Sequence, residues 1–166
     1  CDDDRRSPEH LRTSPDVSHT RKGVIVLANR APFTHERRGD GGVSLKRSAS
    51  GLVTALEPLV EACSGTWVAH GAGNADTACA DDRGGLDVPP ANPRYRLRYV
   101  WQPDHEHRGY YYGFANEGLW PLCHLAHTRP VFRSEDWRHY KGVNRRFADA
   151  VCEEVDADDP IVLVQD

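Results

Sequence analysis

The sequence predicts an α/β fold with an open, largely parallel sheet of the Rossmann type, and three observations support this. Short apolar runs at 23–30 (GVIVLANR) and 161–166 (IVLVQD) are typical of strands that are buried on both faces. Apolar residues recur at helical spacing at 50–64 and 134–155. Strand and helix patterns alternate along the chain, which indicates an open α/β sheet.

The first strand, 23–30, leads into a polar stretch, 33–48, that contains Gly-Asp-Gly-Gly and therefore predicts an exposed hairpin. A helix follows at 50–64, with Ser50 as a candidate cap, and Pro58 is expected to kink or locally break it. The buried face predicted for this helix contains Leu52, Leu56, Leu59, Val60 and Cys63.

The middle of the chain predicts two more strands, at 65–71 and at 94–102, where side chains alternate. The glycine- and aspartate-rich segment between them is expected to be a loop. Further along, Asn116 can cap a helix that continues to residue 127. This leaves 110–114 as an irregular aromatic segment at the entrance of that helix.

The clearest helix is predicted at 134–155, with Ser134 as its cap and two acidic residues near the positive end of its dipole. Its predicted stripe contains Trp137, Tyr140, Asn144, Phe147, Ala148, Val151 and Val155. The segment DADDP ends the helix, and 161–166 is expected to form a final buried strand.

Composition restricts the partners and the number of domains. The chain has 166 residues, of which 28% are charged, and a net charge of -4. This small charge predicts binding to neither nucleic acid nor an anionic membrane, and no apolar run is long enough to span a bilayer. Residues 1–22 have few apolar side chains and predict a disordered tail, whereas 23–166 predict one globular unit.

The cysteines and histidines predict neither disulfides nor a metal site. The five cysteines are scattered without a Cys-x-x-Cys pair, and we expect Cys63, Cys123 and Cys152 to be buried thiols in a cytoplasmic, reducing compartment. His124 and His127 could approach Cys123 on a helix, but a structural metal site usually needs a fourth ligand, which is not evident. No cofactor is therefore expected.

Two predicted strands end on a charged residue, the first on Arg30 and the last on Asp166. Ligands bind at the carboxyl ends of strands in open α/β sheets. Gly51 would let a phosphate approach the free N–H groups at the start of the following helix, and Arg30 could hold a second anion. The alternative interpretation is that these charges are only the polar ends of strands.

Several common enzyme motifs are absent from the sequence. It has no Gly-x-Gly-x-x-Gly fingerprint, no phosphate-binding P-loop and no Gly-x-Ser-x-Gly elbow. The aromatic segment 110–124 (YYYGFANEGLWPLCH) could be either core or a platform for a sugar. Composition alone favours core.

Six motifs occur in the order seen in the trehalose-6-phosphate synthase family: LANRAP, SASGLVTALEP, GTWVAHGAG, YYYGFANEGLWPLCH, WRHYKGVNRRFADAV and VLVQD. Residues 23–166 thus resemble the N-terminal portion of these retaining glycosyltransferases. The resemblance implies the GT-B architecture, with this chain as an incomplete first Rossmann-like domain. It also implies transfer of glucose from a nucleotide sugar, with UDP-glucose as the expected donor, to glucose 6-phosphate, which gives trehalose 6-phosphate.

The resemblance also implies roles for individual residues. Arg30 would bind the acceptor phosphate, and Gly51 would face the donor diphosphate. Tyr111 and Trp120 would line the glucose 6-phosphate site, with Phe114 and Leu119 packed beneath them. Asp166 matches an aspartate at the sugar pocket of the family and is the predicted catalytic residue.

Two departures from the family pattern leave alternatives open. His70 stands where the family commonly has tryptophan near the acceptor, and Ser50 stands where glycine often precedes Gly51. A glucosylglycerol-phosphate synthase, with glycerol 3-phosphate as acceptor, is one alternative, and a non-catalytic sugar-phosphate binding module is another. Because most donor contacts of the family lie in parts beyond Asp166, we expect the 166-residue chain alone to lack transferase activity; the full-length protein could form a homo-oligomer.

Overall fold

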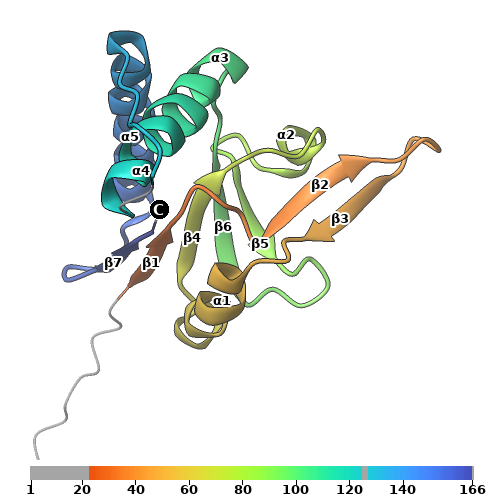
Figure 1. Ribbon diagram of the computed structural model, residues 1–166. Helices are drawn as coiled ribbons and strands as arrows, with labels where there is room; N and C mark the ends of the chain where they lie inside the picture. The colour runs from red at the N-terminus through yellow and green to blue at the C-terminus, as the bar shows by residue number, and fades with distance from the viewer. Residues whose placement is uncertain (1–22, 125–126, 166) are drawn as a thin grey trace, which may run out of the picture.

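A five-stranded sheet with helices on both faces forms the centre of the protein, as the computed structural model shows for residues 23–124 and 127–165 (Figure 1). The strand order is β5-β6-β4-β1-β7, in which only β5 is antiparallel to its neighbour. The strands are β1 (Val24–Leu27), β4 (Thr66–His70), β5 (Gly85–Val88), β6 (Tyr95–Val100) and β7 (Ile161–Val164). The expected α/β fold is confirmed.

The helices and a separate hairpin account for the other elements. The helical segments are α1 (Gly51–Cys63), α2 (Asp76–Cys79), α3 (Asp104–His107), η1 (Arg108–Leu119), α4 (Trp120–Cys123) and α5 (Ser134–Glu154). The hairpin consists of β2 (Phe33–Arg37) and β3 (Val43–Arg47) and projects away from the sheet (Figure 1). None of the helices in these ranges is long and apolar enough to cross a membrane.

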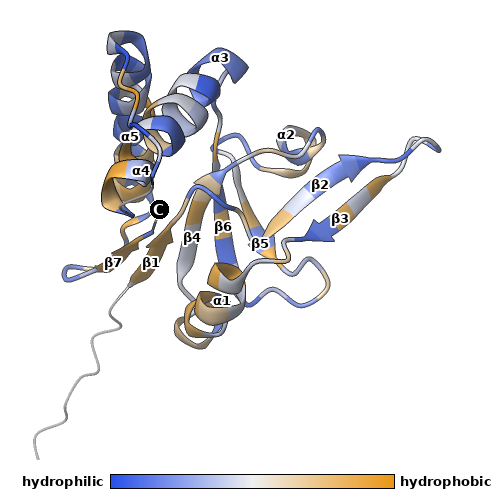
Figure 2. Cartoon of the chain, viewed as in Figure 1, coloured by the Kyte–Doolittle hydropathy of each residue, from blue (hydrophilic) through white to orange (hydrophobic). Residues whose placement is uncertain are grey.

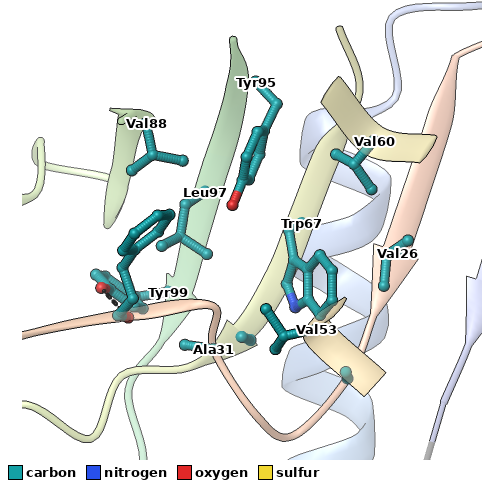
Figure 3. Packing of buried hydrophobic residues seen from close by; sticks show 12 residues of the cluster. Val26, Ala31, Val53, Val60, Trp67, Val88, Tyr95, Leu97 and Tyr99 are labelled. Carbon is teal, nitrogen blue, oxygen red and sulfur yellow. Dashed lines mark hydrogen bonds between the residues drawn. The ribbon is translucent and has the colours of Figure 1, made fainter. Parts of the chain in front are cut away.

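Alternating side chains of the central strands pack on the two faces of the sheet. Val26 and Trp67 join the cluster that α1 covers, together with Val53 and Val60 (Figure 3). Their strand neighbours belong to the opposite cluster, which α5 covers; its members include Ile25, Val68, Val143, Phe147 and Val151. β1 and β4 are therefore strands whose two faces are both removed from water by helices.

The buried faces of α1 and α5 differ from the predicted buried faces by a rotation about the helix axis. In α1 the buried residues are Val53, Glu57 and Val60, whereas Leu59 and Cys63 are exposed, and the helix continues through Pro58 without a break. The buried residues of α5 are Val143, Phe147, Ala150 and Val151, whereas Trp137, Asn144 and Ala148 are exposed. Ser134 is the first helical residue of α5 and not its cap.

The hairpin is anchored, which corrects the expectation that it is simply exposed. Asp76 is fully buried, and its Oδ1 accepts hydrogen bonds from the backbone N–H of His35 at 2.6 Å and from His35 Nδ1 at 3.0 Å. At the other end, Arg47 pairs with the buried Glu57, which also accepts a 2.8 Å hydrogen bond from the hydroxyl of Tyr95. Buried carboxylates with such partners fix the hairpin against the sheet.

β7 is less buried than expected. It pairs with β1 at the end of the sheet, and Ile161, Val162 and Val164 are exposed, although Figure 2 shows the strand as hydrophobic. Along the described chain, only one long edge of β7 has a strand partner. The sequence pattern of a strand buried on both faces thus corresponds here to an edge strand.

The segment from Asp104 to Cys123 is one continuous helical stretch, α3–η1–α4, and its central part has π-helical hydrogen bonding. The prediction of an irregular aromatic segment followed by a helix capped by Asn116 is therefore wrong. Gly109, Gly113 and Gly118 are buried where the stretch meets His139, Asp136 and Phe132. Close approach to these side chains leaves no room for a Cβ, so the glycines determine how this stretch packs.

Other expectations have mixed outcomes. β5 lies inside the segment predicted as a loop. Cys63, Cys123 and Cys152 are free as predicted, but they are exposed and not buried. Within the described ranges no group of three or more metal-binding side chains occurs. The predicted tail, 1–22, lies outside the described residues.

Candidate functional site

The candidate site lies at the carboxyl end of β1, where the chain leaves the sheet. The loop after β1 is held against β4 by two hydrogen bonds: His70 N–H donates to Asn29 O, and Trp67 Nε1–H donates to Arg30 O, each at 3.2 Å. The Arg30 side chain is exposed, and its guanidinium has no partner among the described residues. A fixed backbone with a free guanidinium is suited to binding an anion.

Asn29 is a candidate residue that the sequence reasoning did not single out. Its Oδ1 is buried and has no hydrogen-bond partner in the described protein. A buried polar atom without a partner is unusual and calls for an explanation, such as a bound ligand. Its position beside Arg30 in the LANRAP motif was the available signal.

Gly51 is the first residue of α1, and the backbone at this helix start is accessible to a ligand. No side chain caps the helix start, and a Cβ built on Gly51 would meet nothing within 4 Å. Ser48 N–H donates to Pro32 O at 2.8 Å, which brings the chain before α1 back to the loop that follows Arg30. The structure therefore leaves the first N–H groups of this 13-residue helix available to an anion.

Tyr111 and Trp120 lie nine residues apart on the α3–η1–α4 stretch. In an α-helix, with about 3.6 residues per turn, residues at this separation lie on opposite faces. The i→i+5 bonds of a π-helix, seen where Trp120 N–H donates to Ala115 O, place more residues in each turn. The step from Tyr111 to Trp120 then approaches two whole turns, so the π-helical backbone brings both rings towards one face.

The environments of the two rings differ. Trp120 is 51% exposed and contacts the ring of His124 with centroids 3.4 Å apart. Tyr111 is half-buried and stacks on His107, with centroids 5.5 Å apart. Phe114 instead packs against Phe132, Trp137 and Tyr140, and among the described residues no ring contact joins it to Tyr111 or Trp120.

His70, at the end of β4, lies beside this aromatic group. Its ring stacks on His107 with centroids 4.5 Å apart, and burial lowers the pKa of both imidazoles. Proximity to His107 lowers the pKa of His70 further. Tyr110, next to Tyr111, packs on Tyr140 and Phe147, and burial raises its pKa to about 12, so its hydroxyl remains protonated.

The predicted site residues are only partly brought together. His70 joins the two halves, because its backbone holds Asn29 and its ring reaches Tyr111 through His107. In the described ranges no hydrogen bond, ion pair or ring contact joins Arg30 or Gly51 directly to Tyr111 or Trp120. Asp166 lies outside the described residues; its neighbour Gln165 donates a 2.7 Å backbone hydrogen bond to Leu27 O.

A largely parallel open sheet with an exposed arginine and an open helix start at its carboxyl edge is typical of α/β domains of the Rossmann type, a class that binds ligands at this edge. The sequence profile described as Glycosyltransferase family 20 matches residues 22–166. The chain therefore belongs to glycosyltransferase family 20, and the resemblance drawn from the sequence motifs is confirmed.

Individual relatives are trehalose-6-phosphate synthases. The chain is 39% identical over 145 residues to the trehalose-6-phosphate synthase of Mycobacterium avium (strain 104), an alignment that covers 87% of the chain and 28% of the relative. A solved E. coli structure bound with UDP-2-fluoro glucose matches with a TM-score of 0.60 and 20% identity, over 86% of the chain and 27% of the other. The chain thus spans about a quarter to a third of the length of these relatives.

A second solved structure is an alpha,alpha-trehalose-phosphate synthase (UDP-forming) from Burkholderia xenovorans in complex with glucose-6-phosphate. It matches with a TM-score of 0.57 and 17% identity, over 87% of the chain and 28% of the other. At this identity the likeness shows the shared fold. The GT-B assignment of the fold is therefore supported by structures as well as by sequence.

Proposed function

We propose that this chain is the acceptor-binding part of a retaining glucosyltransferase that transfers glucose from UDP-glucose to glucose 6-phosphate and forms trehalose 6-phosphate. The observation that carries the proposal is the carboxyl edge of the sheet, where a free Arg30 guanidinium lies on a backbone that is bonded to β4. Membership of the family and the trehalose-6-phosphate synthases among its relatives support this reaction.

Arg30 and Gly51 would bind the two phosphorylated groups. The guanidinium would form paired, charge-assisted hydrogen bonds with the acceptor phosphate. The free N–H groups at Gly51 would face the donor diphosphate and offset its negative charge. Asn29 Oδ1, which has no partner in the described protein, would accept a hydrogen bond from a substrate hydroxyl.

The two aromatic residues would position the acceptor sugar. Trp120 offers an exposed indole face for stacking, and Tyr111 offers a ring with a hydroxyl group. Asp166 would act at the sugar pocket. With the donor phosphate assisting removal of the acceptor proton, the protein contributes mainly positioning and charge stabilisation.

The alternative acceptor is glycerol 3-phosphate, and His70 is the observation that favours testing it. An imidazole at the end of β4 provides a smaller stacking surface than the tryptophan common in the family, and glycerol 3-phosphate has no sugar ring that needs such a surface. A non-catalytic module that only binds a sugar phosphate is the remaining alternative. We further propose a cytoplasmic location, where nucleotide sugars and sugar phosphates are available.

Activity is tested with the polypeptide encoded by the complete reading frame that contains these residues. It is incubated with UDP-glucose and either glucose 6-phosphate or glycerol 3-phosphate, and UDP release and the configuration of the new bond are measured. We expect a retained, α-configured product with glucose 6-phosphate. Turnover with glycerol 3-phosphate alone would favour the first alternative, and acceptor binding without turnover would favour the second.

A further inference from the structure

Three rings form one stack that joins the sheet to the aromatic helix. His70 at the end of β4 stacks on His107, the last residue of α3, with centroids 4.5 Å apart and planes at 20°. His107 stacks in turn on Tyr111 of η1, at 5.5 Å and 15°. No direct ring contact between His70 and Tyr111 occurs in the described protein. His107 is therefore the link between them.

Hydrogen bonds fix both imidazoles. His107 Nδ1 lies 3.1 Å from Oε1 of Gln102, and His70 Nδ1 lies 3.4 Å from the backbone oxygen of Val100. Both oxygens only accept, so each Nδ1 carries the proton and donates it. Neither imidazole can flip without losing its hydrogen bond. The bonds therefore fix the orientation of the His107 ring face that stacks on Tyr111.

The environment of the stack favours the uncharged form of the imidazoles of His70 and His107. Burial lowers the pKa of both histidines, and proximity to His107 lowers that of His70 further. Asp104 acts in the opposite direction on both, and Asp76 does so on His70. The other rings that face His107 are those of Tyr110 and Tyr112. At neutral pH the lowered pKa values therefore favour the uncharged form of both imidazoles.

We propose that His107 is a positioning residue for acceptor binding: it holds the ring of Tyr111 in place from the His70 end of β4, beside the loop that carries Arg30. This inference rests on the proposed function, because it assumes that Tyr111 faces the sugar phosphate. His70 then acts as the base of the stack, and the imidazole of His107 lies between it and Tyr111.

The test measures binding of glucose 6-phosphate to the 166-residue chain by NMR titration, with three variants. His107→Ala removes the middle ring, and we expect binding to weaken roughly five-fold, which corresponds to about 1 kcal/mol and is typical of a stacked pair. His107→Phe keeps a ring of similar shape, and we expect it to restore most of the affinity. His105→Ala is the control, because His105 is exposed on the same helix and contacts His139 instead.

A pH series separates positioning from a general structural role. Lowering the pH from 7 to 5 favours the protonated form of both histidines, which introduces charge into the stack, and we expect acceptor binding to weaken more in the wild type than in His107→Phe. Unchanged binding in His107→Ala would overturn the inference, as would a His107→Phe variant that is folded but as weak as His107→Ala. If the wild type bound no glucose 6-phosphate at any pH, the proposed function itself would fail, which is a different result from either of these.

Discussion

The Arg30 side chain is the residue on which the proposed acceptor site depends most. Its backbone is fixed by the indole of Trp67, whereas its guanidinium is exposed and has no partner within the described ranges. Removing the guanidinium should therefore weaken ligand binding and leave the fold unchanged. We expect Arg30→Ala to weaken glucose 6-phosphate binding at least ten-fold, since a charged hydrogen bond contributes about 1.5–3 kcal/mol. Calorimetry measures the affinity, and Arg38→Ala, an exposed arginine in the hairpin turn, is the control.

His70 and His107 make the stability of the chain depend on pH. Their pKa values are lowered in the folded state, so the folded chain binds fewer protons than the unfolded chain once the pH falls below about 6.5. The free energy of unfolding should therefore decrease from pH 7 to pH 5. Urea unfolding should show a smaller decrease for His107→Phe than for the wild type. The same decrease in both proteins would contradict this assignment.

At the scale of elements, the contact between η1 and α5 depends on glycines. A Cβ at Gly113 would collide with the carboxylate of Asp136, whereas Gly142 of α5 has nothing within 4 Å. We expect Gly113→Ala to destabilise the chain by about 1–3 kcal/mol through overpacking. Gly142→Ala is the matched control and should stabilise it by about 0.5–1 kcal/mol through helix propensity. Thermal or urea unfolding measures both, and equal effects would contradict the packing account.

The hairpin β2–β3 depends on the buried carboxylate of Asp76. Its two oxygens accept hydrogen bonds from the N–H of Gly73 and from both the backbone and the ring of His35. Asp76→Asn keeps one acceptor oxygen but loses the charge, and we expect a loss of about 1–3 kcal/mol in the free energy of unfolding. Asp82→Asn, an exposed carboxylate nearby in sequence, should change the stability little. A similar effect of the two substitutions would argue against the anchoring role.

The sequence predicted the sheet and its helices well because both depend on regular apolar periodicity. β1, β4, β6, β7, α1 and α5 all lie within the predicted ranges. The buried faces of α1 and α5 were harder to predict, since Glu57 is buried through partners that are distant in sequence, Arg47 and Tyr95. Such partners are not visible in a helical pattern.

In the candidate site, too, features that depend on local sequence could be predicted, whereas features that depend on distant residues could not. The accessible positions of Arg30 and Gly51 could be predicted because one follows the first strand and the other begins a helix, whereas their roles as ligand-binding residues stay predictions. The relation of Tyr111 to Trp120 could not be predicted, because nine residues place two side chains on one face only in a π-helical backbone. The role of His107 depends on His70, which is far away in sequence and meets it only in the folded chain.

At the scale of the whole molecule, the chain matches only part of the length of its relatives. It spans about 28% of the M. avium relative. We expect the purified 166-residue chain to release no UDP from UDP-glucose in the presence of glucose 6-phosphate, because it would lack most donor contacts. A coupled UDP assay measures this, with the polypeptide of the complete reading frame as the positive control. Turnover by the 166-residue chain would contradict this expectation.

The central claim is that the carboxyl edge of the sheet binds a sugar phosphate, and amide NMR of the 166-residue chain tests it most directly. The account predicts that glucose 6-phosphate shifts the amide signals of Arg30, His70 and Tyr111, that glucose without phosphate shifts them far less, and that Arg30→Ala removes the response. Signals that remain unchanged up to saturating glucose 6-phosphate, or that shift only at residues remote from this edge, would contradict it.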